Sequence, residues 1–212
     1  MASLEGLGFV AIWNDVLSQK VDDFVAWHRQ EHMPERLAIP GFVSGTRWRA
    51  TGTARGYFTL YLLESPAVAL SEPYLYRLNN PTPWTLRVMA SFRQNSRCVG
   101  RFDQSVGALP SERIAVAKYN GSLRGSLADG LANRVTACAG INGCHFGLAN
   151  AAASALPTTE RQGRDVAEPA GMLIVSLAGG ADDAAAAEGM RTTLPRVSFD
   201  EVTILERELA MP

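Results

Sequence analysis

The order of strand and helix patterns occurs twice along the chain, and this repeat restricts the fold more than any other feature. In residues 1–108 the hydrophobic period alternates between the values typical of strands and of helices. The strands are expected at 6–13, 43–50, 57–63 and 92–106, and the helices at 21–32, 65–78 and 82–89. The resulting order is βαββαβ, which is that of a ferredoxin-like unit.

Residues 109–212 repeat this order. The strands are expected at 113–119, 142–148, 171–177 and 201–208, and the helices at 124–137 and 182–192. In such a unit the helices cover one face of the sheet, so the other face must be buried against something. We therefore expect an α+β fold in which two ferredoxin-like βαββαβ units, residues 1–108 and 109–212, pack sheet to sheet as an α/β barrel.

The interior of this barrel is the first place where a cavity is expected. In the strand at 57–63, hydrophobic residues alternate with residues that carry hydroxyl groups, namely Tyr57, Thr59 and Tyr61. A wall that is largely apolar and offers a few hydroxyls suits a small-molecule pocket. We predict that this set lines the cavity. The segment 150–170 has no apolar period and is expected to be a long loop, either a lid or simply mobile.

The segment WHRQEHMPERLAIPGF, residues 27–42, holds two histidines and a glutamate within five positions. At the helical period, His28 and His32 lie within roughly 60° of Val21 and Val25, on the apolar side of the helix. Trp27 and Glu31 belong to the neighbouring stripe. Poorly solvated surroundings of this kind bring carboxyl and imidazole groups toward the pKa range in which they transfer protons.

Three interpretations of this motif remain open. The pattern H-x-x-E-H matches a zinc-protease motif and places two imidazoles within reach of one ion, but a third ligand is missing. In a purely structural interpretation, one imidazole bonds a backbone carbonyl and the other is exposed. In the third, His28 or His32 acts as general acid or base, and Glu31 orients or tunes it.

The order of a strand, a helix ending in W-H-x-x-E-H-x-P and a strand after P-G-F resembles the EthD-like and related members of the dimeric α/β-barrel superfamily. The specific part of the resemblance covers about residues 24–49. It implies ferredoxin-like units whose sheets pair across a dimer or a tandem fusion, and a cavity for small, rather apolar molecules. Several members catalyse cofactor-free oxygenation, isomerisation, decarboxylation or cyclisation, and others bind haem. The resemblance makes His28 and His32 candidates for proton transfer or for holding a substrate oxygen.

The second unit departs from this pattern, because its first predicted helix has no histidine and only His145 remains, on a strand. We therefore expect a single asymmetric site. Further binding candidates are Trp27, Tyr57 and Tyr61, together with either Arg47 or Trp48. Arg47 and Trp48 occupy opposite faces of one strand, so an anion-holding guanidinium or a stacking indole could enter the cavity, although a surface arginine is the simpler alternative.

The charge balance argues against nucleic acid or an anionic membrane as partners. The sequence has 20 Lys and Arg and 21 Asp and Glu, and neither sign forms long blocks. Three cysteines without a C-x-x-C pair suggest reduced thiols, and residues 1–9 lack the features of a signal peptide or membrane anchor, so a cytoplasmic protein is expected. No dinucleotide, P-loop or nucleophile-elbow motif occurs.

The function expected from these features is that of a cofactor-independent enzyme. It would act on a small, rather apolar molecule by histidine-mediated proton transfer, as an isomerase, decarboxylase or monooxygenase. The alternative is a noncatalytic ligand-binding or assembly protein of the same fold, and a zinc or haem protein is a further possibility. A homodimer remains open, because a fused pair satisfies its own sheets but retains strand edges.

Overall fold

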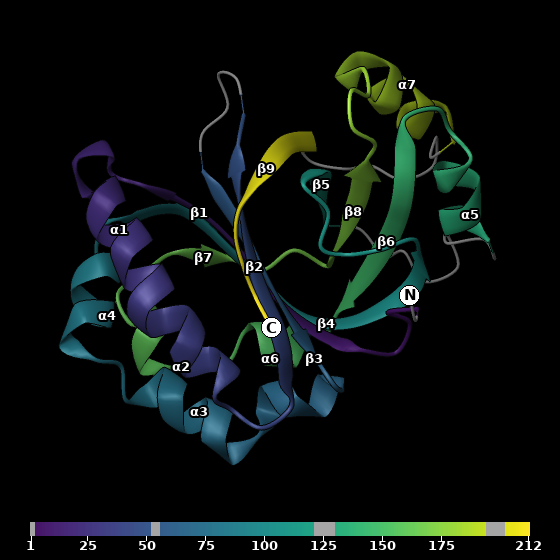
Figure 1. Cartoon of the computed structure of the whole chain (residues 1–212). Coiled ribbons are helices and arrows are strands. Elements are labelled where there is room, and N and C mark those ends of the chain that lie inside the picture. Colours follow the sequence, from purple (N-terminus) through teal and green to yellow (C-terminus); the bar gives the residue numbers. More distant parts are fainter. Residues whose placement is uncertain (1–2, 52–55, 121–129, 194–201) are drawn as a thin grey trace.

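Eight of the nine strands in the described part of the chain form one closed antiparallel barrel (Figure 1). The computed structural model describes residues 3–51, 56–120, 130–193 and 202–212. In chain order the barrel strands are β1 (Gly8–Val16), β2 (Phe42–Ala50), β3 (Tyr57–Leu63), β4 (Phe92–Val106), β5 (Arg113–Tyr119), β6 (Ile141–Ala149), β8 (Gly171–Leu177) and β9 (Val202–Met211). The short strand β7 (Val166–Ala167) pairs in parallel with β4 outside the barrel.

The strand order confirms the expected fold class. The first four strands pair in the order β4-β1-β3-β2 and the later four in the order β9-β5-β8-β6, each the arrangement of a ferredoxin-like unit. Two seams join the units edge to edge: β2 pairs with β9, and β4 pairs with β6. Because both seams are antiparallel ladders, the barrel closes through main-chain hydrogen bonds as well as through buried side chains.

The helices lie outside the barrel in two groups (Figure 1). The first group consists of α1 (Val21–Trp27), a π-helical turn (His28–His32), α2 (Met33–Leu37), α3 (Glu72–Asn79) and α4 (Pro83–Met89). The second part of the chain has α5 (Leu131–Thr136), α6 (Ala151–Ser154) and α7 (Asp183–Thr193). The predicted helix at 124–137 begins outside the described residues. In the described part of the chain, no helix combines the length and hydrophobicity needed to cross a bilayer.

The first helical segment continues beyond the proline at which we expected it to end. Proline lacks the N–H group that an α-helix requires in its interior. The chain accommodates Pro34 through the preceding π-helical turn, in which Met33 N donates to the carbonyl oxygen of His28, five residues back, and Pro34 then occupies the first turn of α2. The extra turn extends the segment to Leu37 and brings Arg36 onto the face that carries the histidines.

The centre of the barrel is packed rather than hollow, so the interior cavity that we expected is confined to one end of the barrel. Its core contains large side chains from both units, including Phe9, Trp48, Phe58, Phe102 and Met172. A pocket that both units line is confined to one end, beside Trp13, Tyr57, Val116, Lys118 and Leu205. The alternation of hydrophobic and hydroxyl-bearing residues along β3 does distinguish its two faces. The hydroxyl-bearing face, however, points toward the helices and not into the barrel.

Candidate functional site

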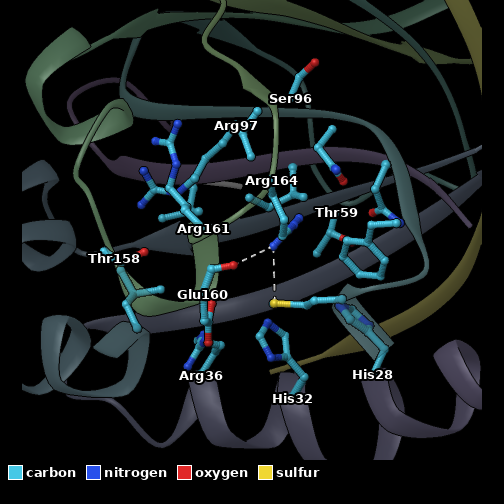
Figure 2. A pocket seen from close by; sticks show the side chains of 18 of the residues that line it. His28, His32, Arg36, Thr59, Ser96, Arg97, Thr158, Glu160, Arg161 and Arg164 are labelled. Atoms are coloured by element: carbon cyan, nitrogen blue, oxygen red, sulfur yellow. Dashed lines mark hydrogen bonds and ion pairs between the residues drawn. The ribbon is translucent and has the colours of Figure 1, made fainter. Parts of the chain in front are cut away.

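A pocket containing both histidines lies between the sheet of the first unit and its helices (Figure 2). Strands β1, β3 and β4 form one wall, the helical segment from Phe24 to Arg36 forms another, and the segment from Thr158 to Val166 completes the enclosure. Its free space is about 80 Å³. The apolar lining residues include Val10, Ile12, Phe24, Trp27, Met89 and Phe92. The pocket is thus small and largely apolar, with polar groups at selected points.

His28 and His32 are buried in this pocket, with exposed fractions of 4% and 8%. Burial lowers the pKa of His28 well below 6.5, and the charges of Arg47 and Arg36 lower it further. Burial lowers the pKa of His32 in the same way, assisted by Arg36. Both imidazoles are therefore neutral near pH 7. The Nδ1 atom of each ring is buried without a hydrogen-bond partner among the described residues.

Aromatic contacts fix the orientation of the two histidine rings. The Trp27 ring packs against His32 with a centroid distance of 4.3 Å, and Phe24 lies 5.6 Å from His28. The centroids of His28 and His32 are 5.7 Å apart. These contacts arise around the π-helical turn, an irregularity that is frequently found at functional sites. The predicted site residue Trp27 thus lines the pocket beside both histidines.

Tyr61 is the second predicted residue that reaches the histidines. Its hydroxyl oxygen lies 3.4 Å from His28 Nε2, and either group can donate, depending on the imidazole tautomer. Burial raises the pKa of Tyr61, so its hydroxyl keeps its proton at all physiological pH values. Thr59, from the same face of β3, also lines the pocket. The phenol therefore holds one edge of the His28 ring and can share a proton with it.

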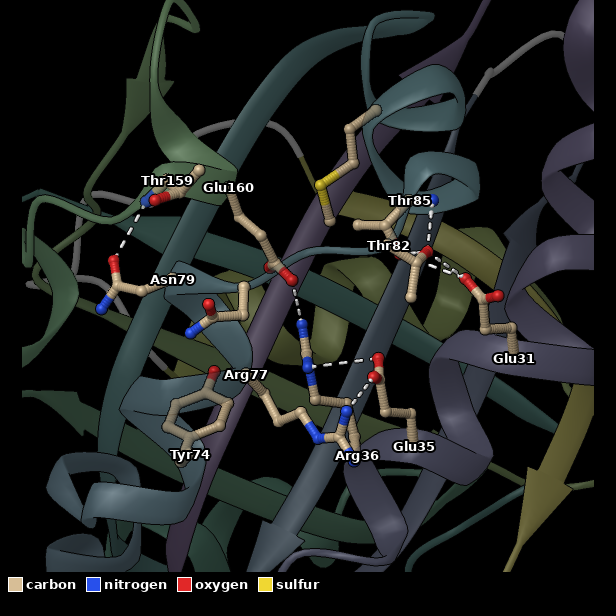
Figure 3. A network of polar contacts seen from close by, with 12 residues as sticks. Glu31, Glu35, Arg36, Tyr74, Arg77, Asn79, Thr82, Thr85, Thr159 and Glu160 are labelled. Carbon is tan, nitrogen blue, oxygen red and sulfur yellow. Dashed lines mark hydrogen bonds and ion pairs between the residues drawn. The ribbon is translucent and has the colours of Figure 1, made fainter.

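Glu31 does not contact the histidines as we expected. Its Oε1 atom accepts hydrogen bonds from Thr82 Oγ1 at 2.6 Å and Thr85 Oγ1 at 3.4 Å, at the start of α4 (Figure 3). Thr85 Oγ1 in turn accepts from Trp27 Nε1 at 3.1 Å. The carboxylate therefore acts on the site indirectly, by holding the hydroxyl that binds the indole.

The remaining predicted residues lie outside the histidine pocket. Arg47 lies under α1, where its guanidinium stacks on Phe24 at 5.2 Å and its Nε donates to Glu208 at 3.2 Å. Trp48 belongs to the barrel core, and its Nε1 donates to the carbonyl oxygen of Ser111 at 2.8 Å. Tyr57 packs on Phe24 and lines the pocket at the end of the barrel. Arg47 still influences the site, since its charge lowers the pKa of His28.

The second unit contributes a segment that is docked on the first unit by buried polar contacts (Figure 3). Arg36 forms an ion pair with Glu160, and both side chains are at most 8% exposed. For Arg36 the cost of burial is outweighed by the nearby carboxylate, so its pKa is raised. Thr159 N donates to Asn79 Oδ1 at 3.2 Å. The predicted loop at 150–170 therefore closes the pocket of the first unit.

Sequence patterns did not reveal the polar residues that this segment and β4 bring to the pocket. These residues are Asn95, Ser96, Arg97, Thr158, Glu160, Arg161 and Arg164. Arg36 could have been found, because it follows His32 by four residues, but the proline between them suggested that the helix had ended. Nothing local identifies the others, since their position depends on pairing between distant segments.

His145 lies in the second unit, away from the pocket, and it gives a testable dependence of stability on pH. It is fully buried, its Nδ1 lies 2.8 Å from Ser105 Oγ, and burial lowers its pKa from 6.5 to about 4. The unfolded chain binds this proton first, so the stability contribution is present above pH 6.5 and is lost as the pH falls toward 4. The loss should be on the order of 3 kcal/mol, at about 1.4 kcal/mol per unit of pKa.

The measurement is urea unfolding between pH 7.5 and 4.5 for the wild type and for His145→Asn, whose amide can still bond Ser105. We expect a shallower decline of the unfolding free energy in the variant. Equal slopes in the two proteins would show that His145 is not the group that takes up the proton.

Comparisons with known proteins show the fold. No family model matches the sequence, and no curated protein matches it. Solved structures match along nearly the whole chain. An anthrone oxidase-like protein is 10% identical with a TM-score of 0.59, covering 99% of this chain and 95% of its own. A protein from Fusobacterium nucleatum that is assigned as a monooxygenase is 4% identical with a TM-score of 0.57, covering 97% and 94%.

A chlorite dismutase from Candidatus Nitrospira defluvii is 8% identical with a TM-score of 0.51, covering 97% of this chain and 92% of its own. A haem-binding protein from Thermus thermophilus also matches, with 12% identity and a TM-score of 0.51. At such low identities the likeness shows a shared ferredoxin-type barrel and nothing about activity. The specific resemblance to EthD-like proteins stays a prediction.

A haem does not fit the histidine pocket as it stands. The free space of about 80 Å³ is smaller than the roughly 150 Å³ of a cavity that accepts benzene, and a porphyrin is far larger. In the described part of the chain, no three His, Cys, Asp or Glu side chains gather closely enough to hold a metal ion.

Proposed function

We propose that this chain is a cofactor-independent enzyme that binds a small, largely apolar organic molecule in the histidine pocket and transfers a proton with His28 or His32. The observation that carries the proposal is a pair of buried, neutral imidazoles in a pocket with aromatic walls, each with a ring nitrogen that has no partner among the described residues. A buried polar atom without a partner costs free energy, so it commonly marks a position that a ligand fills.

The chemistry follows from the charge state of the rings. A neutral imidazole has a lone pair that can accept a proton from an acidic C–H or O–H group of the ligand. The products of this step are an imidazolium and a ligand anion, and the protein must stabilise both. Isomerases, decarboxylases and cofactor-free monooxygenases all pass through a carbanion or enolate, which forms when the substrate loses a proton or CO2 and is consumed by a proton or by O2, so the same pocket could serve any of them.

One feature supports His28 as the group that receives the proton. Its Nε2 lies 3.4 Å from the Tyr61 hydroxyl, which stays protonated and can relay a proton to or from the ring. The positive charges of its neighbours Arg36 and Arg47 lower the pKa of His28 and oppose proton uptake, but they make the imidazolium a stronger acid that returns the proton readily. His32 provides a second neutral ring beside it.

The proposal is tested by exchange of ligand protons with solvent. The purified protein is incubated in D2O with small carbon acids such as acetone and the larger cyclopentanone, which suit a free space of about 80 Å³, and deuterium uptake is followed by mass spectrometry. Protein-dependent exchange that saturates with ligand supports the proposal. Saturable binding without exchange supports instead a noncatalytic binding protein of the same fold.

The pH profile of this exchange is a further expected result. The base is active when neutral, and its pKa is lowered well below 6.5, so kcat/KM should stay constant from pH 8 down to pH 6 and fall only at lower pH. No upper limb is expected from Tyr61, whose pKa is raised by burial. An inflection between pH 6 and 7 would indicate an ordinary exposed histidine and would contradict this assignment.

A further inference from the structure

The histidine pocket has an excess of positive charge. Its lining includes four arginines, Arg36, Arg97, Arg161 and Arg164, and one acidic residue, Glu160. The two histidines are neutral and do not alter this balance. Among the described residues, Arg36 forms its closest ion pair with Glu160, and Arg161 pairs with Glu168. Neither Arg97 nor Arg164 forms an ion pair in that part of the chain, although the nearby Glu160 carboxylate attracts Arg164.

Arg97 is buried and bonded only to neutral groups. Its Nη1 donates to the carbonyl oxygens of Ala153 at 2.7 Å and Ser154 at 3.0 Å, and its Nη2 donates to the Tyr74 hydroxyl at 3.4 Å. Arg161 donates to the same Ser154 oxygen, so two guanidinium groups lie side by side (Figure 2). Like charges held together with little water repel each other, and an anion between them relieves this repulsion.

Arg164 is less fully satisfied than Arg97. Its Nε is buried and has no hydrogen-bond partner among the described residues. Its Nη1 donates to the carbonyl oxygen of Glu160 at 2.9 Å and to Met89 Sδ at 3.3 Å, and thioether sulfur is a weak acceptor. The guanidinium lies over the ring of Phe92 at 5.2 Å. Figure 2 shows Arg164 across the pocket from His28 and His32.

A neutral donor adds to these charges. Asn14 lines the same pocket and is only 4% exposed, and its Nδ2 has no hydrogen-bond partner among the described residues. Buried N–H groups without partners are rare in folded proteins, because each costs the desolvation free energy of the group. The unpaired atoms of Asn14 and Arg164 are both donors, so each is suited to an acceptor atom of a ligand.

We propose that the pocket recognises its ligand through an anionic oxygen, bound by Arg164 and Arg97, while the apolar body of the ligand packs against Trp27 and Phe92. The inference rests on the proposed function for the place and the size of the ligand. Bonds from a guanidinium to an anionic oxygen are stronger than bonds between neutral groups. The ligand is therefore a small organic acid, or a molecule that becomes an enolate or phenolate when it loses its proton.

The free space sets an upper limit on this ligand. About 80 Å³ is less than the roughly 150 Å³ of a cavity that accepts benzene, so a single ring enters only if a side chain moves. The Met89 side chain is the one suited to move, because methionine is unbranched and its contact with Arg164 is weak. A carboxylate that displaces the Met89 sulfur from Arg164 would occupy the volume that the methionine leaves and would accept the hydrogen bond from Arg164 Nη1.

The test is calorimetric titration with benzoate, phenol and the neutral analogue benzyl alcohol. The variants are Arg164→Met, which removes the charge with little change in length, and Arg164→Lys, which retains it. The matched control is Arg93→Met, which removes an exposed arginine that does not line the pocket. Circular dichroism and thermal unfolding check that each variant is folded.

We expect benzoate to bind the wild type at least tenfold more tightly than benzyl alcohol. Arg164→Met should weaken benzoate binding by about tenfold to a hundredfold, as expected for loss of a hydrogen bond to a charged group, and leave benzyl alcohol unchanged. Arg164→Lys should retain part of the affinity, and Arg93→Met should differ from the wild type by less than about twofold, since an exposed charge is screened.

Phenol separates two sources of the anion. Proton release on phenol binding, measured in buffers of different ionisation enthalpy, indicates a phenolate formed in the pocket, whereas binding of benzoate alone indicates a preformed carboxylate. Equal affinities for benzoate and benzyl alcohol, equal effects of the Arg164 and Arg93 changes, or no benzoate binding at millimolar concentration would each overturn the inference. If the protein binds benzoate but does not exchange ligand protons, the anion site stands and the proposed catalysis does not. If it exchanges ligand protons but does not prefer an anion, the proposed catalysis stands and the anion site does not.

Discussion

Replacing Glu160 with glutamine should lower the free energy of unfolding by about 3–5 kcal/mol, because it leaves the Arg36 guanidinium buried without its counter-charge. Both side chains of this pair are at most 8% exposed. The second carboxylate near Arg36, that of Glu35, lies at 3.7 Å and already pairs with Arg77 at 2.7 Å, so it can replace Glu160 only in part. The remaining uncompensated charge is the source of the expected loss.

Urea unfolding of the wild type and of Glu160→Gln measures this effect. The matched control is Glu112→Gln, which removes an exposed ion pair with Arg207 in which Glu112 is 74% exposed, and a change within about 0.5 kcal/mol is expected there. The double variant Arg36→Met with Glu160→Met should recover much of the loss, since no buried charge remains. If Glu160→Gln is as stable as the control, the pair is not a buried support of the fold.

The second large effect concerns the proposed proton transfer. His28→Asn should lower the rate of protein-dependent deuterium exchange by about a hundredfold to ten-thousandfold, the contribution typical of a general base. We expect a smaller loss for His32→Asn, because only His28 has the Tyr61 hydroxyl at 3.4 Å. Neither change should unfold the protein, since each also removes a buried nitrogen that lacks a partner among the described residues.

His145→Asn is the control for this experiment, because it alters a buried histidine that lies outside the pocket. Its exchange rate near pH 7.5 should match that of the wild type. Tyr61→Phe distinguishes a positioning role from a structural one: we expect kcat to fall while KM and the thermal midpoint stay nearly constant. Wild-type exchange rates in both His28→Asn and His32→Asn would remove the histidines from the mechanism.

The sequence predicted several strands well because they are short apolar runs rich in β-forming residues, some of which alternate with a two-residue period. The predicted strands at 57–63, 92–106, 113–119 and 171–177 coincide with β3, β4, β5 and β8. The end of the first helical segment was missed because the rule that proline stops an α-helix does not consider a π-helical turn. Pattern alone also could not show which face of β3 meets the helices, since alternation is symmetric between the two sides.

Only the part of the candidate site that lies on the first helical segment could be predicted from the sequence. His28, His32 and Trp27 lie on one continuous helical segment, so their spacing in the sequence predicts that they are close in space. Glu160 lies 124 residues from its partner Arg36, and no local pattern encodes that contact. Glu31 was assigned the wrong neighbours for the same reason, because the hydroxyls that it binds belong to Thr82 and Thr85 at the start of α4. Long-range pairing therefore determines the charge of the pocket.

The two seams of the barrel also restrict how the halves of this chain can change over time. β9 pairs with β2 on one side and with β5 on the other, so an insertion or deletion in β9 would shift its alignment with both units at once. β4 is constrained similarly between β1 and β6. Diversification is therefore easiest in the connections, and the connection between β6 and β8 is the one that brings Glu160 and Arg164 to the pocket. A chain built from two such units can give them different roles while the shared ladders keep one architecture.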